Sequence, residues 1–328
     1  LDLHDARGQE LARELATRAD ILVENFRPGA LEAWGLGYDA LHALNPRLVY
    51  VSISGYGQWG PERERMGYDP LAQAESGWMS LNGAPDGDPV KSPTFLGDDL
   101  AGMHAAISAL AALRHRDRTG EGQHVDIALL DSLLFQSCGN LTLGALDEPL
   151  PRLGNQFRIA APANLYPCAD GHVLVGVVLD AQWQRMAALM GRPELATDPR
   201  YATNAARLEH RAEMDALVGA WVADQPVAPL VRACQEASVP IAELRDYHRS
   251  ARHPNVAARD MLAPTELHGR EVPLPGPAAK LSRTPTAVRE APQALGAQSA
   301  EILRELGCEG DEIAALAERG VTRLTPPA

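Results

Sequence analysis

The sequence predicts an α/β fold in which a smaller α+β domain interrupts a larger domain built on a parallel sheet. The first observation is an alternation of helical periodicity with short β-branched strands up to about residue 145, the rhythm of βαβ units. The second is a change near Pro149, where turn formers replace helical periodicity, and a further proline-rich stretch at 271–285. A chain of 328 residues is long enough for both domains.

The first 148 residues supply most of the larger domain. An apolar strand at 21–23 follows the first helix, and the run LVYVSISGYG starts the next strand at Leu48. Strands at 21–23, 48–54 and 124–128 are expected to be buried neighbours joined by right-handed crossovers. The helices expected around them cover 7–18, 38–44, 99–115 and 130–145.

The rest of the chain is predicted to be mostly helical. One strand is indicated by HVLVGVV at 172–178, after the turn formed by Asp170 and Gly171. The two proline-rich crossings place the large domain at 1–148 and 265–328, and the small domain with its linkers at 149–264. The helices predicted beyond residue 172 cover 181–190, 207–223, 226–237, 299–306 and 310–319.

Composition excludes several classes of protein. A formal net charge of −13 argues against nucleic-acid binding, which needs clustered Lys and Arg side chains. The four cysteines are scattered, without the spacing of a disulfide framework or a zinc site. No apolar run approaches the roughly 20 residues of a membrane-spanning helix. We therefore expect a cytoplasmic protein with no metal, nucleic-acid or membrane partner.

Asp98 and Asp99 stand directly before a long apolar segment. The segment is predicted to be helical because Leu100, Met103 and Ile107 recur at helical spacing. An Asp at this place is a preferred N-cap, and a second acid in the first turn suits the positive end of the helix dipole. The local pattern alone therefore requires no chemistry of either carboxylate.

The turn ENFRPGA, residues 24–30, follows a predicted strand and contains Arg27, a planar donor suited to phosphate. Loops at strand ends are where α/β sheets bind ligands. The alternative is an ordinary turn in which Arg27 pairs with a surface carboxylate. GYGQWGP at 55–61 also leaves a strand, but it lacks the G-K-[ST] of a P-loop.

Tyr68 and Asp69 precede another short helix in the segment MGYDPLAQAESG. Tyr68 could orient a substrate, although residue type alone favours a place in the core with its hydroxyl satisfied. Neither the G-x-S-x-G elbow of hydrolases nor the H-E-x-x-H of zinc proteases is present.

The joint order of these fragments resembles one known family. ILVENFRPG, VYVSISGYGQWGP, GYDPLAQAESGWM, GDDLAGMHAAISALAAL and RLGN follow one another as in the family III CoA-transferases. This CaiB/BaiF family includes formyl-CoA transferases, carnitine CoA-transferases and α-methylacyl-CoA racemases. The resemblance extends to about residue 325 and is densest up to Asp131. It implies a large Rossmann-like parallel-sheet domain, a smaller inserted α+β domain and an interlocked homodimer.

The resemblance also implies site residues and chemistry. The acid that opens the "GD…AG" helix corresponds to the family's catalytic aspartate, which places it on Asp98 and not on Asp99. Its carboxylate would attack an acyl-CoA thioester and then carry CoA as an aspartyl thioester to a carboxylic acid. CoA and acyl-CoA are thus substrates, and no tightly bound cofactor is implied. Residues expected to border CoA are Asn25, Phe26, Arg27 and Ala30 at the nucleotide, with Tyr68 and Asp69 near the thioester.

Two departures from the family accompany the resemblance. Ala33 stands where many relatives carry a basic residue, so one phosphate contact is expected to be lost or supplied elsewhere. The family's first βαβ portion, which contributes part of the CoA pocket, does not precede Leu1 in this sequence.

Two other functions remain open from the sequence. An α-methylacyl-CoA racemase shares the fold but has a His at the position of Tyr68, and a tyrosine with its pKa near 10 is a poor base at neutral pH. A non-catalytic acyl-CoA-binding subunit is suggested by the absent first βαβ portion, whereas Asp98 argues against it.

Overall fold

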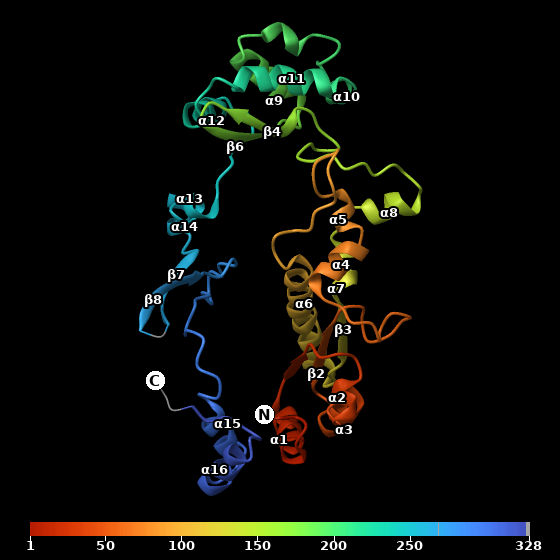
Figure 1. Cartoon of the computed structure of the whole chain (residues 1–328), viewed down its shortest axis with the longest axis vertical. Helices are drawn as coiled ribbons and strands as arrows, with labels where there is room; N and C mark the ends of the chain where they lie inside the picture. Colours follow the sequence, from red (N-terminus) through yellow and green to blue (C-terminus); the bar gives the residue numbers. More distant parts are fainter. Residues whose placement is uncertain (268, 326–328) are drawn as a thin grey trace. The chain divides into compact units, whose positions relative to one another are not determined.

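We describe the protein from a computed structural model, which covers residues 1–267 and 269–325. The chain divides into two compact units. The first comprises Leu1–Arg152 with Gln293–Ala328, and the second comprises Leu153–Pro292. Each unit is described by itself below, with the elements labelled in Figure 1.

A three-stranded parallel sheet forms the centre of the first unit, as the sequence predicted. Its strands are β1 (Ile21–Glu24), β2 (Val49–Ser54) and β3 (His124–Ala128), in the order β1-β2-β3. The register pairs Val23 with Val51, and Val51 in turn with Val125. Val49, Tyr50 and Val51 of β2 are almost completely buried because helices cover both faces of the sheet.

The two faces of β2 pack against different helices. Tyr50 points to α1 (Ala6–Arg18), α2 (Ala30–Ala33) and α3 (Tyr38–Leu44), and packs in a cluster with the fully buried Leu41. Val51, which alternation along the strand turns to the other side, packs against the alanines of α6. The prediction of a helix-covered sheet is confirmed.

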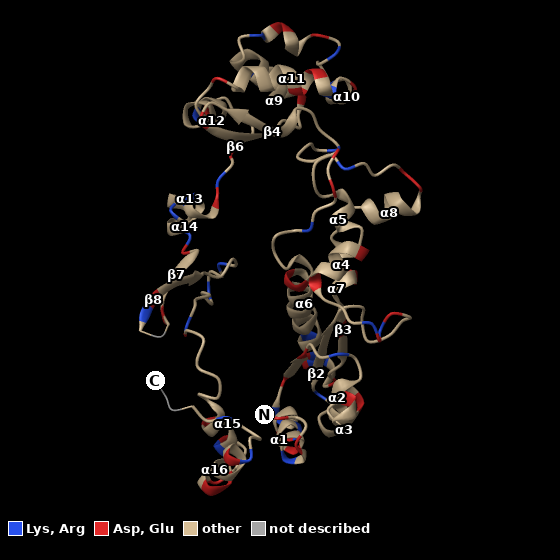
Figure 2. Cartoon of the chain, in the orientation of Figure 1, with Lys and Arg blue, Asp and Glu red and all other residues tan. Residues whose placement is uncertain are grey.

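Helix α6 (Leu96–Thr119) begins three residues before its predicted start at 99. Its N-cap is Phe95, which has no side-chain cap hydrogen bond. The expectation that Asp98 caps this helix is therefore wrong, because Asp98 and Asp99 both lie in the first turn, the acidic start of α6 in Figure 2. At the other end, Gly120 in the left-handed conformation stops the helix.

The buried face of α6 consists of small side chains. Ala105, Ala109 and Ala112 lie against the sheet, whereas Met103 and Ile107 are exposed. Small side chains let the helix approach the valines of β2 closely. Met103 and Ile107, whose spacing helped to indicate the helix, are thus not the residues that hold it to the sheet.

The helix predicted at 130–145 is broken. It forms α7 (Leu129–Phe135) and α8 (Asn140–Ala145), because Cys138 and Gly139 both adopt positive φ angles between them. Short helices α4 (Asp69–Glu75) and α5 (Trp78–Leu81) lie between β2 and α6 in the chain.

The two ends of the first unit's chain pack together. Helices α15 (Ser299–Glu305) and α16 (Gly310–Glu318), at the positions predicted, share a core with Leu11 of α1. In Figure 1 they lie in blue beside α1 in red. The backbone N–H of Asp2 donates to the carbonyl of Val321 at 2.8 Å, which closes this contact.

The second unit has an antiparallel sheet covered by helices. The strands are β4 (Ala163–Cys168), β5 (Gly171–Gly176) and β6 (Ile241–Glu243), paired in the order β4-β5-β6. Strand β5 was predicted, whereas β4 was missed because its sequence is rich in turn formers. The helical elements are α9 (Asp180–Leu189), the 3₁₀ helix η1 (Pro193–Ala196), α10 (Asn204–Glu209), α11 (Arg211–Val222) and α12 (Val227–Glu236).

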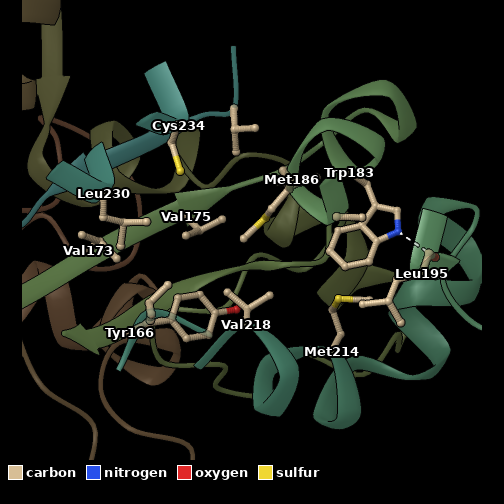
Figure 3. Packing of buried hydrophobic residues seen from close by; sticks show 14 of the residues in the cluster. Tyr166, Val173, Val175, Trp183, Met186, Leu195, Met214, Val218, Leu230 and Cys234 are labelled. Carbon is tan, nitrogen blue, oxygen red and sulfur yellow. Dashed lines mark hydrogen bonds between the residues drawn. The ribbon is translucent and has the colours of Figure 1, made fainter. Parts of the chain in front are cut away.

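Trp183 is a fully buried residue of this second core. Its indole N–H donates to the carbonyl of Leu195, and Met186, Met214 and Val218 surround it (Figure 3). The helix predicted at 207–223 is interrupted at His210, between α10 and α11.

The remaining elements of the second unit are α13 (Tyr247–Ala251), α14 (Pro254–Ala258) and the hairpin of β7 (Leu262–Leu267) and β8 (Arg270–Pro275). The hairpin was not predicted because prolines occur in both strands, and Pro264 is even paired with Pro273.

Replacing Leu41 by Ala should destabilise the first unit. Leu41 is fully buried beneath the sheet, so we expect the free energy of unfolding to fall by about 2–5 kcal/mol. Leu44→Ala on the same helix is the matched control, because Leu44 is 55% exposed and its loss should cost less than about 0.5 kcal/mol. Urea titration followed by circular dichroism measures both, and equal effects would contradict this packing of α3.

Candidate active site

The chain brings three segments to one edge of the parallel sheet. The loops after β1 and β2 leave from the carboxyl ends of the strands. Helix α6 connects β2 to β3 and covers the sheet, so it runs back along the strands and starts at the same edge. Ligands of open α/β sheets bind at this edge.

Glu24, at the end of β1, holds the first residues of the loop that follows the strand. This carboxylate is buried at the end of the strand and accepts the backbone N–H of Phe26 at 2.8 Å. Burial is the main cause that raises the pKa of Glu24. Asn25, Phe26 and Arg27 are exposed above it, and the Phe26 ring lies edge-on to Trp34 at 5.6 Å.

Arg27 makes no ion pair with any residue in the described parts of the chain, so the surface pair considered from the sequence does not form there. Ala30 begins α2 directly after this turn. The four predicted nucleotide-binding positions, Asn25, Phe26, Arg27 and Ala30, thus lie in one segment at the ligand edge, and the Arg27 guanidinium has no ion-pair partner among the described residues.

The loop after β2 is closed by two glycines. A Cβ on Gly55 would lie only 2.5 Å from the Cα of Gly67, so both positions need the absence of a side chain. This contact returns the chain to the end of β2, and Tyr68 follows immediately.

Tyr68 and Asp69 face opposite ways. Tyr68 is 65% exposed, so a place in the core, which its residue type favoured, is wrong. Asp69 is 2% exposed. Its Oδ1 accepts the backbone N–H of Gly97 at 2.6 Å, and its Oδ2 accepts a hydrogen from Gln73 at 2.8 Å. The protein itself therefore occupies both oxygens of Asp69.

This arrangement brings the residue next to Tyr68 and the residue next to Asp98 into contact. Tyr68 precedes Asp69, and Asp98 follows Gly97, so each is one residue away from the same 2.6 Å hydrogen bond. Asp98 is exposed and has no hydrogen-bond partner among the described residues. Partial desolvation, and then repulsion from Asp69 and Asp99, raise the pKa of Asp98. An unpaired carboxylate of raised basicity is suited to nucleophilic attack.

Two residues of the site were not identified from the sequence. Gly97 accepts the close approach of Asp69, and Gln73 is fully buried beside it. The available signal was the spacing of Asp69 and Gln73, which places them four residues apart on one helix face.

A cavity of about 480 Å³ lies nearby in the first unit. Leu133, one of its lining residues, also lies against Gly97. Ser76, Trp78, Asn82 and Leu141 are further lining residues, and none of the described side chains that line it is charged. Within the described residues, no cluster of three or more His, Cys, Asp or Glu side chains is placed to hold a metal ion.

Fold and site together define an α/β protein that presents an unpaired carboxylate at the ligand-binding edge of its parallel sheet. Residues 1–299 match CoA-transferase family III. The chain belongs to this family, and it is a family III CoA-transferase, as its sequence resemblance implied.

Curated relatives and a solved structure agree with this assignment. The chain is 37% identical to a succinyl-CoA–D-citramalate CoA-transferase of Chloroflexus aurantiacus, over 98% of this chain and 81% of the relative. It is 36% identical to a succinate–glutarate CoA-transferase of Agrobacterium fabrum, over 93% of this chain and 77% of the relative. A CAIB/BAIF family protein from Brucella suis superposes with a TM-score of 0.80 at 33% identity, over 93% and 80% of the two chains.

The raised pKa of Asp98 can be tested directly. We expect its carboxyl to titrate above about 3.9, the ordinary value for Asp. Asp99→Asn should lower this pKa, because it removes a neighbouring negative charge that disfavours the ionised form. Carbon-13 NMR of the carboxyl carbons measures both. Asp86→Asn, at an exposed loop acid, is the control, and an Asp98 pKa that responds equally to both substitutions would contradict this electrostatic environment.

Proposed function

We propose that this enzyme moves CoA from an acyl-CoA thioester to a carboxylic acid through a covalent aspartyl-CoA intermediate on Asp98. The observation that carries the proposal is the Asp98 carboxylate itself, which is unpaired among the described residues, has a raised pKa and lies in the first turn of α6 at the ligand edge. Family membership supports it, because CoA-transferases use CoA thioesters.

The reaction proceeds as two matched exchanges. The Asp98 carboxylate attacks the thioester carbonyl, which forms a mixed anhydride and expels the CoA thiolate. The thiolate attacks the aspartyl carbonyl, which gives the aspartyl-CoA thioester and releases the donor acid as its carboxylate. The acceptor carboxylate then attacks this thioester, and the expelled thiolate attacks the acceptor carbonyl of the new anhydride. The products are the new acyl-CoA and the regenerated Asp98 carboxylate.

This sequence of steps needs no ATP, because a thioester and a carboxylate are exchanged for a thioester and a carboxylate. The enzyme must instead hold the reactants in register and keep water from the anhydride. We assign Tyr68 to the side of the thioester, where its exposed ring follows the closed loop after β2.

We assign CoA binding to the N-terminal part of the predicted large domain, residues 1–148, which lies in the first unit. Asn25, Phe26, Arg27 and Ala30 border the nucleotide, with the free Arg27 guanidinium pairing with phosphate. The exposed Phe26 ring, held on Trp34, offers an apolar surface beside it. Asp69 belongs to the same region, but both of its oxygens are bonded within the protein.

For the acids exchanged, we propose a small dicarboxylic acid on at least one side of the reaction. Relatives at 36–37% identity are named for succinyl-CoA, D-citramalate, succinate and glutarate. A relative from Streptomyces avermitilis, 34% identical over 98% of this chain, is named for formyl-CoA and oxalate.

We further propose an interlocked homodimer in the cytoplasm. Met103, Ile107 and Leu110 form an exposed apolar face on α6, each about 60% or more exposed. A second copy of the chain would remove this face from water. No helix among the described residues is long and apolar enough to span a membrane, and the four cysteines are unpaired, which suits a reducing compartment.

Two substitutions separate the adjacent acids. Asp98→Asn keeps the shape of the side chain but removes the nucleophile, so turnover should fall by at least about 10³-fold. Asp99→Asn should retain most activity. Hydroxylamine should trap a hydroxamate only when succinyl-CoA or another acyl-CoA is present, and peptide mapping should find it on Asp98.

Finding the hydroxamate on Asp99, or on neither acid in an active enzyme, would overturn the assignment of the nucleophile. A separate control addresses the racemase alternative. In deuterated water, a 2-methylacyl-CoA should not exchange its α-hydrogen, and rapid exchange without any acceptor acid would contradict the proposed transferase mechanism.

The proposed dimer can be tested by measuring the mass of the protein in solution. Light scattering at micromolar concentration should find twice the mass of the 35.2 kDa chain. Ile107→Glu should shift the mass toward the monomer because it places a charge on the apolar face of α6. Leu44→Glu on α3, at another exposed apolar side chain, is the control and should leave the mass unchanged. A wild-type monomer, or a dimer indifferent to Ile107→Glu, would contradict this interface.

A further inference from the structure

The first turn of α6 is held from another helix. Its own N-cap, Phe95, supplies no side-chain acceptor, although the first amides of a helix need partners from outside it. The acceptor comes instead from Asp69, which takes the Gly97 N–H at 2.6 Å. Asp69 is the first residue of α4 and is 28 positions away from Gly97 in the sequence. The turn that carries Asp98 is therefore fixed by a buried carboxylate of a different helix.

Gln73 fixes the other oxygen of that carboxylate. It is fully buried, and its Nε2 donates to Asp69 Oδ2 at 2.8 Å and to the carbonyl of Thr94 at 3.3 Å. Its Oε1 accepts the N–H of Ser92 at 2.8 Å. Every bond agrees with this one orientation of the amide, because a flipped amide would lose all three. Gln73 thus ties Asp69 to the segment that leads into α6.

The absence of a side chain at Gly97 allows this contact. A Cβ built on it would lie 3.1 Å from Asp69 Oδ1 and 3.2 Å from a methyl group of Leu133. Any larger residue would push the carboxylate or Leu133 away by a few tenths of an ångström. The close approach therefore depends on a glycine next to the nucleophile.

We propose that Asp69 and Gln73 are positioning residues for Asp98, which fix the first turn of α6 so that the nucleophilic carboxylate meets the thioester in a reactive geometry. This inference rests on the proposed role of Asp98. Neither residue can touch substrate in this arrangement, because both are buried and their polar atoms are bonded within the protein. The role differs from the CoA contact that the sequence resemblance implied for Asp69.

Substitution should lower kcat and leave the KM for acyl-CoA nearly unchanged. In Asp69→Asn, only one acceptor remains for two donors, so the new NH2 group would point either at the Gly97 N–H or at Gln73 Nε2. Gln73 cannot flip to relieve this without losing its bonds to Ser92 and Thr94. Gln73→Met keeps the volume and removes the donor. For each we expect kcat to fall about 10- to 100-fold, the loss that a displacement of up to about 1 Å produces, with KM within about threefold. The rate of hydroxamate formation should fall in parallel.

The pH profile separates the charge of Asp69 from its hydrogen bonds. Asp98 must be ionised to react, so kcat/KM falls at acid pH. The negative charges of Asp69 and Asp99 disfavour ionisation of Asp98, so this fall occurs at a higher pH than it would without them. Asp69→Asn should shift the limb to lower pH, whereas Gln73→Met keeps the charge and should not. Asp99→Asn is the matched control, which should shift the limb while the plateau of kcat stays within about twofold. None of these variants replaces another titratable side chain on α6 or on the elements packed against it. Those side chains include Tyr50, Glu75, His104, His124, Asp126 and Asp131.

A third variant guards against unfolding. Gly97→Ala raises helix propensity and so should not unfold α6, but its Cβ displaces Asp69. It should lower kcat with KM retained, at an unchanged melting temperature. Folded variants at 69, 73 and 97 with kcat within twofold of wild type would overturn the proposal, as would a rise in KM with kcat unchanged, which would make Asp69 a binding residue. If Asp98→Asn is active, Asp98 is not the nucleophile. If Asp98→Asn is inactive but the variants at 69, 73 and 97 keep full activity, only the positioning role is wrong.

Discussion

The hydrogen bond from the Gly97 amide to the Asp69 carboxylate is the contact on which the arrangement of the site depends. It joins the start of α4 to the start of α6, two helices that are separate in the chain. Because it is buried and one partner is a carboxylate, it is of the strong, charge-assisted kind. One bond thereby joins the segment that carries Tyr68 to the segment that carries Asp98, since each residue adjoins one partner.

Small residues make this closeness possible at each level of the fold. Gly97 lets a carboxylate approach the helix backbone, and Gly55 against Gly67 closes the loop that leads to Tyr68. The alanine face of α6 lets the whole helix rest on the valines of β2. A methyl group added at either glycine contact would move the groups that carry the chemistry, because the interior is close-packed.

The parallel sheet accounts for the rest of the site. Parallel strands end at one edge, and a crossover helix begins at that same edge, so the turn proposed to bind the nucleotide after β1 and the proposed nucleophile at the start of α6 lie at one edge of the sheet. The buried Glu24 orders the turn by accepting the Phe26 amide, and it leaves the guanidinium of Arg27 free for an anion. In the proposed mechanism, one segment thus holds CoA and another attacks the acyl carbonyl of its thioester.

Sequence alone determined the α/β class, the three parallel strands and their neighbours, most helices and the family, because these depend on local periodicity and on an ordered set of motifs. It also singled out Asp98 as the candidate nucleophile. It did not determine that α6 starts at Leu96, that Tyr68 is exposed, or that Asp69 is bonded within the protein. Those facts follow from the contact between Asp69 and Gly97, and nothing in the sequence near either residue encodes a partner 28 positions away. The proline-containing strands β4, β7 and β8 were missed for the same reason, since only pairing with another strand makes such segments extended.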